Sequence, residues 1–101
     1  MWICFSDAFL SIVDKAKTPG CLVVRARRKG DIERVFPDAE IVAGAGTDYR
    51  YRAEIPRGIV ARAVASRIEA IDYPNFKNSV KEKRLHGAYE KVWGVMMGLQ
   101  R

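Results

Sequence analysis

The chain has 101 residues, of which 49% are hydrophobic and 30% charged, and its formal net charge is +6 with a pI near 9.6. This length fits one domain over residues 1–101 whose core can form without disulfides or metal, and the composition excludes general disorder. The excess of Lys and Arg favours acidic partners, namely nucleic acid, a nucleoprotein complex or an acidic protein groove.

Two apolar runs near the N-terminus predict a β-hairpin. Residues 2–5 and 9–13 are apolar or aromatic, and residues 6–8 (Ser-Asp-Ala) suit a tight turn. The stretch lacks the basic leading region of a secretory signal, and Asp7 interrupts it. No run reaches the roughly 20 apolar residues of a membrane span. We therefore expect a cytoplasmic protein that binds no membrane.

Arginine alternates with apolar residues in two further segments, 21–27 and 49–55, which predicts two half-buried strands. Because strand side chains point alternately to opposite faces, every second residue shares a side. The arginines that share a side are Arg25 and Arg27 in the first strand, and Arg50 and Arg52 in the second. The opposite sides are apolar enough to face a core. If both strands belong to one sheet, four guanidinium groups stand on its other surface.

The segment between these two strands predicts a helix, a strand and a loop. Residues 31–36 predict a short helix that Asp31 caps and Pro37 stops. Residues 40–43 predict a short strand, and residues 44–48 a flexible connection.

The C-terminal half predicts three helices. Pro56 suits the first turn of a helix whose apolar residues recur at spacings of three and four. These residues are Val60, Val64, Ile68 and Ile71. Asp72-Tyr73-Pro74 then breaks the helix, and Asn75 can cap a shorter one. The last helix is amphipathic through Leu85, Tyr89, Val92, Trp93, Met96 and Leu99. Aromatic and Met residues at helical spacing are usually core, so we expect Trp93 and Met96 to be buried.

This order of elements predicts an α+β fold. We expect an antiparallel or mixed sheet of about five strands with helices packed on one face, as a ferredoxin-like core plus an N-terminal hairpin and C-terminal helices. The sequence leaves open whether the hairpin extends the sheet or packs over it. Packing over the sheet would cover the arginines.

The best candidate for a partner-binding site is the arginine surface of the predicted sheet. It comprises Arg25, Arg27, Arg28, Arg50 and Arg52. The alternative is an ordinary solvated sheet face on which nearby acids such as Glu40 or Glu54 pair with the arginines. Like charges directly opposite on neighbouring strands are unfavourable, so four of one sign need either interleaved acids or an external acidic partner.

Direct nucleic-acid binding is a second possibility for this surface. Sheet-surface RNA binders stack bases on exposed aromatic rings while arginines hold phosphates. Here Tyr49 and Tyr51 alternate with the arginines, which predicts that the rings face the other side. The remaining candidate partners are the phosphate groups of a nucleic acid and an acidic groove on a protein.

No cofactor, metal site or catalytic residue is predicted. His86 is the only histidine, and Cys4 and Cys21 are far apart in sequence within apolar runs where a buried, reduced thiol is usual. No activated nucleophile is apparent, which argues against an enzyme. Residues 44–46 (Gly-Ala-Gly) precede a strand instead of a helix, unlike a phosphate or dinucleotide loop.

Three stretches together resemble a group of small uncharacterised bacterial proteins found in phage, prophage and plasmid contexts. They are FLSIV at residues 9–13, LVVRARRKGDIERVF at residues 22–36, and the C-terminal motifs TDYRYRA, IDYPNFK and AYEKVWGVM. The resemblance spans nearly the whole chain and implies no catalytic residues. It implies a small inhibitor or adaptor that docks on host machinery, as anti-CRISPR proteins do.

The leading hypothesis from the sequence is therefore a non-enzymatic binding protein of mobile-element type. It engages an acidic site on a host protein or nucleoprotein complex through its arginines and inhibits host defence. The alternative is a nucleic-acid-binding protein that contacts phosphates with low sequence selectivity.

Overall fold

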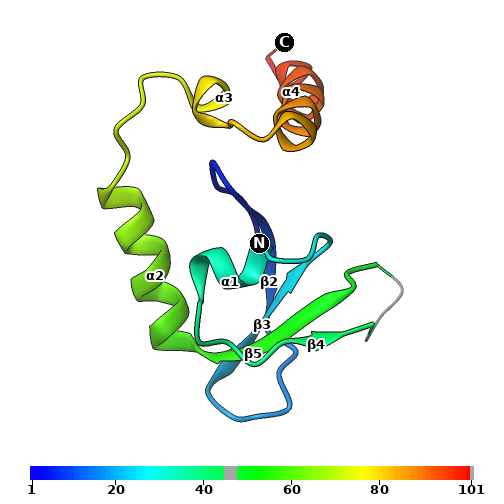
Figure 1. Cartoon of the computed structure of the whole chain (residues 1–101), viewed down its shortest axis with the longest axis vertical. Coiled ribbons are helices and arrows are strands. Elements are labelled where there is room, and N and C mark those ends of the chain that lie inside the picture. Colours follow the sequence, from blue (N-terminus) through cyan, green and yellow to red (C-terminus); the bar gives the residue numbers. More distant parts are fainter. Residues whose placement is uncertain (45–47, 101) are drawn as a thin grey trace.

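The computed structural model describes residues 1–44 and 48–100 and shows one α+β domain (Figure 1). Its strands are β1 (Trp2–Cys4), β2 (Phe9–Val13), β3 (Cys21–Ala26), β4 (Val42–Ala43) and β5 (Tyr51–Pro56). Its helices are α1 (Asp31–Val35), α2 (Arg57–Glu69), α3 (Phe76–Ser79) and α4 (Lys83–Met97). The predicted elements are thus present with small shifts of their ends. Most of the predicted connection over residues 44–48 lies outside the described residues.

All five strands form one antiparallel sheet in the order β1-β2-β3-β5-β4. The predicted class and number of strands are confirmed. The N-terminal hairpin extends the sheet through β2, which pairs with β3, so the hairpin does not pack over the arginines. Because β5 lies between β3 and β4, the β3-α1-β4 segment is a split β-α-β unit. A ferredoxin-like topology would place a strand from after α2 beside β3, and here β2 occupies that position.

One face of this sheet forms the hydrophobic core. Alternate residues of the three central strands point inward, and side chains of α1 and α2 cover them. The core residues include Leu10, Ile12, Val24, Ala26, Ala53 and Ile55 from the sheet, with Ile32, Phe36 and Val60 from the helices. Burial of each large aliphatic side chain contributes about 1.5–3 kcal/mol. The strand pattern therefore decides which face the arginines occupy, because the apolar side of each strand must face α1 and α2.

The start of α1 differs from the prediction that Asp31 caps the helix. Gly30 is the cap residue, with a left-handed φ of 96° that glycine adopts readily, and Asp31 is the first helical residue. The Asp31 side chain is 1% exposed and accepts hydrogen bonds from Arg28, Arg34 and the Phe9 backbone N–H. A buried carboxylate needs such donors, so these contacts, and not a capping bond, fix its position.

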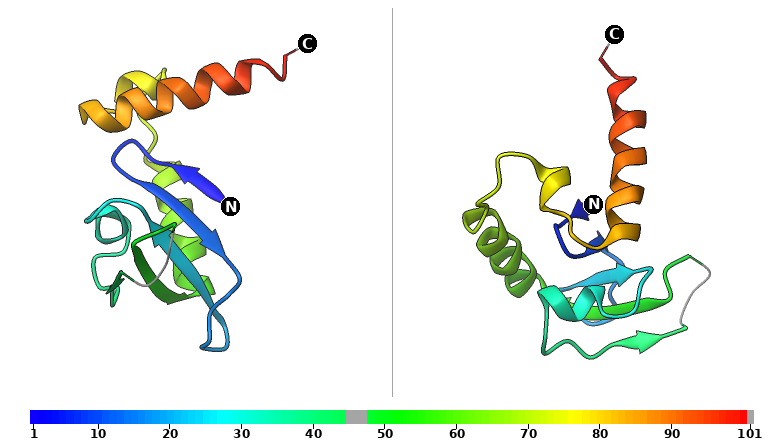
Figure 2. Two further views of the ribbon diagram at one scale, coloured as in Figure 1. Left: turned by 90° about the vertical axis from the view of Figure 1, so that its right-hand side faces the viewer. Right: turned by 45° about the horizontal axis from the view of Figure 1, so that its top comes forward.

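The helices α3 and α4 form a second, smaller cluster at the turn of the N-terminal hairpin. Val80, Leu85 and Tyr89 are buried there, and Phe9 packs against them. Alternation along β2 points Phe9 away from Leu10 and the main core. In Figure 2, α3 and α4 lie beyond the hairpin turn, while α1 and α2 lie along the sheet. The prediction that helices pack on one face thus holds for α1 and α2 and not for α3 and α4.

The second half of α4 extends past the body of the protein (Figure 2). Trp93 and Met96, expected in the core, are 52% and 57% exposed. The α2 helix is also only partly covered, since Val60 is buried whereas Ile68 and Ile71 are exposed. The expectation that Trp93 and Met96 are buried is therefore wrong, and of the apolar positions predicted from helical spacing only Val60, Leu85 and Tyr89 are buried. Within the described residues, the domain is too small to cover the apolar side of α2 or of α4 completely.

Candidate functional site

Arg25 and Arg52 are direct partners across the β3–β5 ladder. Their neighbours Val24 and Ala53 are also partners and are buried in the main core. Because side chains alternate along each strand, both arginines project from the opposite face of the sheet, away from α1 and α2. Both side chains are partly exposed. Two predicted site residues are therefore placed side by side, as the alternation indicated.

The Arg25 guanidinium is held by neighbouring polar and aromatic groups. Its Nη2 donates to Ser11 Oγ at 2.7 Å, and its Cζ lies 4.4 Å from the centre of the Tyr49 ring. Within residues 1–44 and 48–100, its buried Nε has no hydrogen-bond acceptor. Leaving a buried N–H unpaired costs about 1–3 kcal/mol. The contacts orient the Arg25 charge but do not neutralise it.

Arg27 and Tyr49 extend this surface beyond the strand ends. The Arg27 Cζ lies 4.3 Å from the centre of the Tyr49 ring, and Arg27 Nη1 donates to the Asp48 carbonyl at 3.3 Å. The prediction that Tyr49 faces the core side is wrong, because the chain bends at Arg50 and β5 begins only at Tyr51. Tyr49 is 3% exposed. Its ring therefore packs against the arginines and is not free to stack on a base.

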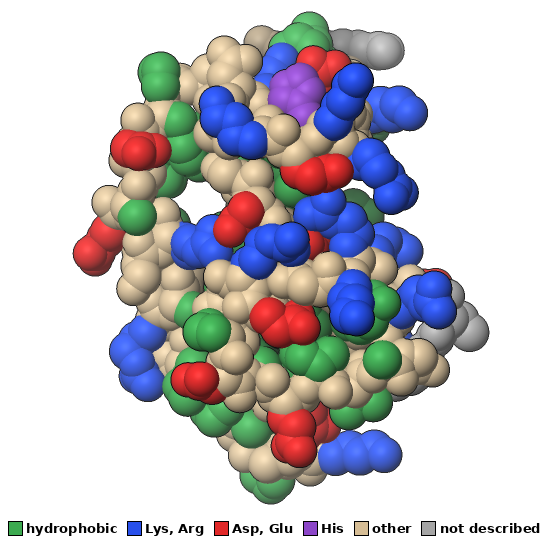
Figure 3. Space-filling view, in the orientation of Figure 1, with side chains coloured by type: hydrophobic (Ala, Val, Ile, Leu, Met, Phe, Trp, Pro, Cys, Tyr) green, Lys and Arg blue, Asp and Glu red, His purple; other side chains and the backbone are tan. Residues whose placement is uncertain are grey.

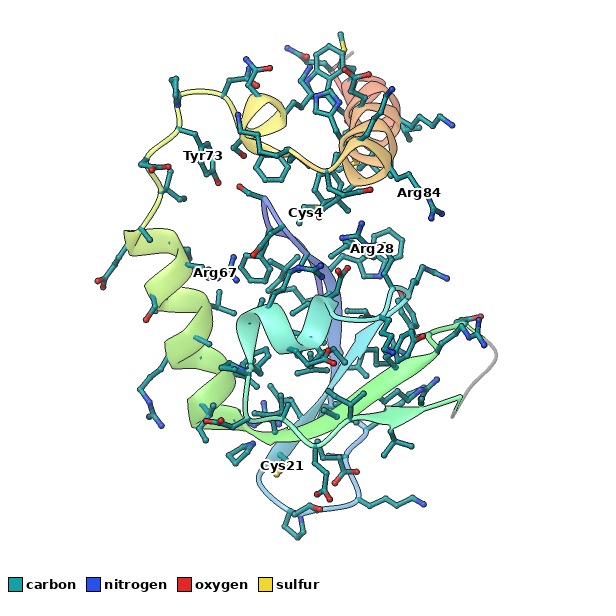
Figure 4. All side chains as sticks on the ribbon, in the orientation of Figure 1. Cys4, Cys21, Arg28, Arg67, Tyr73 and Arg84 are labelled. Carbon is teal, nitrogen blue, oxygen red and sulfur yellow. The ribbon has the colours of Figure 1, made fainter. Side chains whose placement is uncertain are left out.

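We define the arginine face as Arg25, Arg27 and Arg52, with the Tyr49 ring against Arg25 and Arg27 and the Tyr49 carbonyl 3.5 Å from Arg52 Nε. Arg50 is exposed and lies at the bend before β5, so the alternation of the strand does not place it beside Arg52. Arg28 is turned to other partners, donating to Asp31 and, at 2.9 Å, to Glu82 beside α4. Figure 4 shows Arg28 between the sheet and α4. The structure thus joins three of the five predicted site residues.

Neither Glu40 nor Glu54, the acids expected to pair with the arginines, forms an ion pair with them within the described residues. Glu54 shares the open face of β5, but it accepts the backbone N–H groups of Lys17 and Thr18 at 2.7 and 3.0 Å. These hydrogen bonds, with one from the Thr18 side chain as the largest influence, lower the pKa of Glu54. Glu54 thus anchors the loop before β3.

Ion pairs separate the arginines of the chain into two groups. Within the described ranges, Arg28, Arg34, Arg57 and Arg67 pair with acids, whereas Arg25, Arg27, Arg50, Arg52, Arg62 and Arg84 do not. Lys15, Lys17 and Arg52 also line one shallow hollow of about 310 Å³. In Figure 3, Lys and Arg side chains gather along one side of the molecule, over the start of α4 and the sheet end below it. Glu54 lines the same hollow as Arg52, so one acid lies among the basic side chains there.

The described residues contain no group of three or more His, Cys, Asp or Glu able to hold a metal ion. Cys4 and Cys21 are free thiols, and Figure 4 places Cys4 at the hairpin below α4 and Cys21 at the lower end of the sheet. Both were expected to be buried, but Cys4 is exposed and Cys21 only partly buried, because each lies on the open face of its strand. Neighbouring side chains nevertheless remove some water from around the Cys4 thiol, and this desolvation raises its pKa.

No family model matches this chain, and no curated protein or solved structure is significantly similar to it. None of the described helices is both long and apolar enough to cross a bilayer. The candidate site therefore stands on geometry alone.

Sequence reasoning missed the part that Tyr49 plays in the arginine face. The alternating pattern of residues 49–52 suggested one continuous strand, whereas the bend at Arg50 changes which side Tyr49 occupies. Glycines and an aspartate just before Tyr49 were the available signal, because such residues favour turns and irregular backbone.

Proposed function

We propose that this chain is a non-enzymatic binding protein that docks through its arginine face on an acidic site of a host protein or nucleoprotein complex. The observation that carries the proposal is the lack of any ion pair to Arg25, Arg27 or Arg52 within the described residues, although other arginines of the chain are paired. The protein acts in the cytoplasm. Arg28 is left out of the docking set because Asp31 and Glu82 already bind it.

The energetics of the arginine face favour an external acid. Two like charges directly opposite across a ladder destabilise the sheet by tenths of a kcal/mol. A carboxylate or phosphate from a partner would relieve this repulsion and accept two charge-assisted hydrogen bonds from each guanidinium. Since Tyr49 and Ser11 already hold Arg25, little side-chain entropy is lost on binding.

The resemblance to small proteins of mobile elements supports host defence as the target. An inhibitor of this kind would occupy an acidic or nucleic-acid-loading site, for example on a CRISPR effector, and block loading by competition. The burial of Tyr49 supports a protein or nucleoprotein partner over single-stranded nucleic acid, because base stacking is the usual source of affinity for single strands.

Charge reversal on the arginine face tests the proposal. In capture from host lysate, the double variant Arg27→Glu/Arg52→Glu should lose the partner. Arg57→Glu/Arg62→Glu, on the exposed side of α2, reverses the same number of charges and should retain it. Each capture is repeated after nuclease treatment to separate protein docking from nucleic-acid tethering. Equal capture by both double variants would exclude the arginine face.

The alternative function is direct binding of nucleic-acid phosphates with low sequence selectivity. It requires an affinity that falls steeply with salt in proportion to the phosphates contacted. A mobility shift of mixed-sequence duplex and single strands at low salt, lost in Arg27→Glu/Arg52→Glu, would favour this alternative. Absence of a shift at low salt would leave the acidic protein site as the target.

A further inference from the structure

A row of directly paired residues carries the arginine face across the sheet to an exposed tryptophan. Trp2 on β1 pairs with Ser11 on β2, which pairs with Arg25 on β3. Arg52 on β5 follows as the partner of Arg25. Directly paired residues point to the same side of a sheet, so this row lies on the open face, with Trp2 about 10 Å, or two strand spacings, from Arg25. Trp2 is 69% exposed, and its ring stands edge-on to Phe9 with 5.9 Å between ring centres.

Beside Trp2, a hollow of about 260 Å³ opens between the sheet and α4. Arg27 of the arginine face lines this hollow and is exposed to solvent. Figure 4 marks the region by Arg28, which also lines the hollow. Most of the remaining lining is apolar or aromatic, from Trp2, Phe9, Leu85, Ala88, Tyr89 and Val92. The hollow therefore joins an apolar wall to the arginine face.

Arg27 supplies the uncompensated charge of this hollow. Asp31 also lines it, but its carboxylate pairs with Arg28 and Arg34. Arg28 pairs in addition with Glu82, so these two acids and two bases balance one another. Arg27 pairs with no acid among the described residues. An apolar hollow beside an unpaired guanidinium suits a ligand that joins an apolar group to an acid.

The size and lining of the hollow favour one apolar side chain as its occupant. Pockets for whole small molecules measure roughly 300–1,000 Å³, more than this hollow offers. The one hydroxyl of its aromatic and aliphatic lining, on Tyr89, already donates to the carbonyls of Phe5 and Ala8. A nucleic-acid base would lose hydrogen bonds from its polar edges on entry, at a cost that an apolar side chain does not incur. The lining thus favours a protein partner.

We propose that this hollow, the anchor pocket, receives an apolar side chain from an acidic segment of the protein partner. The inference rests on the proposed function and names the partner's chemistry: an aromatic or large aliphatic residue with Asp or Glu beside it. Each residue of an extended segment adds about 3.3 Å, so one carboxylate can reach Arg27 while others reach Arg25 and Arg52. Tryptophan and arginine often dominate the energy of protein interfaces, and Trp2 and Arg27 line this same pocket.

Two acidic peptides test the anchor pocket. A short peptide of Asp and Glu with one central phenylalanine is compared with the same peptide that has serine there. In Trp93→Phe, Trp2 is the sole tryptophan, and its fluorescence measures binding of either peptide. The phenylalanine peptide should bind at least about ten-fold more tightly, because only its side chain is buried in the pocket.

Two matched substitutions in this Trp93→Phe protein locate the contact. Ala88→Phe fills the pocket from an exposed position on α4 and should make the two peptides bind equally. Ala61→Phe makes the same change at an exposed position on α2 and should retain the preference for phenylalanine. Because both positions are exposed, circular dichroism should show a folded chain in each case.

Three results overturn the anchor pocket. They are equal binding of both peptides by Trp93→Phe, a preference for phenylalanine that survives in Ala88→Phe, and no binding of the phenylalanine peptide at about 1 mM. An oligothymidylate that quenches Trp2 fluorescence, and no longer does so in Ala88→Phe, also overturns it, in favour of a base.

The double variant Arg27→Glu/Arg52→Glu separates this inference from the proposed function. If that variant binds the serine peptide as tightly as its parent does, the arginine face is not the docking site. If it loses both peptides while its parent binds them equally, the arginine face stands and only the anchor pocket is removed.

Discussion

Arg25 and Arg52 stand directly opposite each other on β3 and β5, with no acid paired to either side chain among the described residues. Like charges directly opposite each other on neighbouring strands are destabilising. This like-charge pair thus lowers the stability of the free protein and favours an acidic partner.

Reversing the charge of Arg52 should stabilise the free protein. In Arg52→Glu, the new carboxylate faces Arg25 and replaces repulsion by attraction, a gain of about 0.2–1 kcal/mol. For a domain of this size, Tm should rise by up to about 4–8 °C at low salt and less at high salt. Arg62→Glu on α2 should leave Tm nearly unchanged. A fall in Tm for Arg52→Glu would show that Arg52 already has a favourable partner in the free chain.

Loss of the buried carboxylate at position 31 should destabilise the fold strongly. Asp31→Ala removes the common acceptor of Arg28, Arg34 and the Phe9 backbone N–H. Arg28 and Arg34 are partly exposed and can be hydrated, so the cost comes mainly from the lost charge-assisted hydrogen bonds and from the Phe9 N–H left without its acceptor, about 1–3 kcal/mol. Urea unfolding measures the loss. Asp38→Ala, at an exposed position after α1, is the control and should change stability by less than about 0.5 kcal/mol.

Removal of the Tyr89 hydroxyl should loosen α4 from the hairpin turn. This buried hydroxyl shares its one hydrogen between the carbonyls of Phe5 and Ala8, at 3.0 and 2.9 Å. Tyr89→Phe should lower stability by about 0.5–1.5 kcal/mol at neutral pH, measured by urea unfolding. Tyr73→Phe, on the partly exposed linker before α3, should be nearly neutral.

Tyr89 also predicts a loss of stability at alkaline pH. Burial, with smaller effects of Cys4 and Asp31, raises the pKa of its phenol above the ordinary 10.0. The unfolded chain then loses this proton before the folded one does. The contribution is complete below pH 10 and is lost as pH rises through the raised pKa. Tyr89→Phe should therefore lose less stability between pH 9 and pH 11 than the wild type, and an equal loss would refute this account.

Glu82 should hold the first turn of α4 in a pH-dependent way. Its carboxylate accepts the Leu85 backbone N–H at 2.6 Å and pairs with Arg28. The Leu85 hydrogen bond is the largest cause that lowers the pKa of Glu82 from 4.5. Its contribution is present above pH 4.5 and is lost as pH falls through the lowered pKa.

Amide hydrogen exchange checks this cap. Glu82→Gln should speed exchange several-fold in the first turn of α4 at neutral pH, and the difference from wild type should vanish in acid. Glu90→Gln, at an exposed site on the same helix, should leave the first turn unchanged. Similar exchange in both variants would show that packing of Leu85 alone holds the helix end.

The sequence by itself determined the order of the secondary-structure elements and the open side of β3 and β5. The two-residue period of 21–26 and 51–55 predicted which side faces the core, and the structure places Arg25 and Arg52 opposite that side. The Asn75 cap was also predicted correctly, since its side chain accepts the Asn78 backbone N–H. These features depend on neighbours along the chain, so local patterns reveal them.

Only the tertiary structure decided which apolar side chains are buried and which charged side chains form contacts within the chain. The hairpin joins the sheet at β3, Tyr49 packs against Arg25, and Asp31 takes Arg28 away from the arginine face. Helical spacing did not indicate that Trp93 is exposed. Spacing predicts which residues share one side of a helix, but it does not predict what packs against that side. Each of these outcomes depends on contacts between residues far apart in sequence, and such contacts form only when the sheet and helices pack.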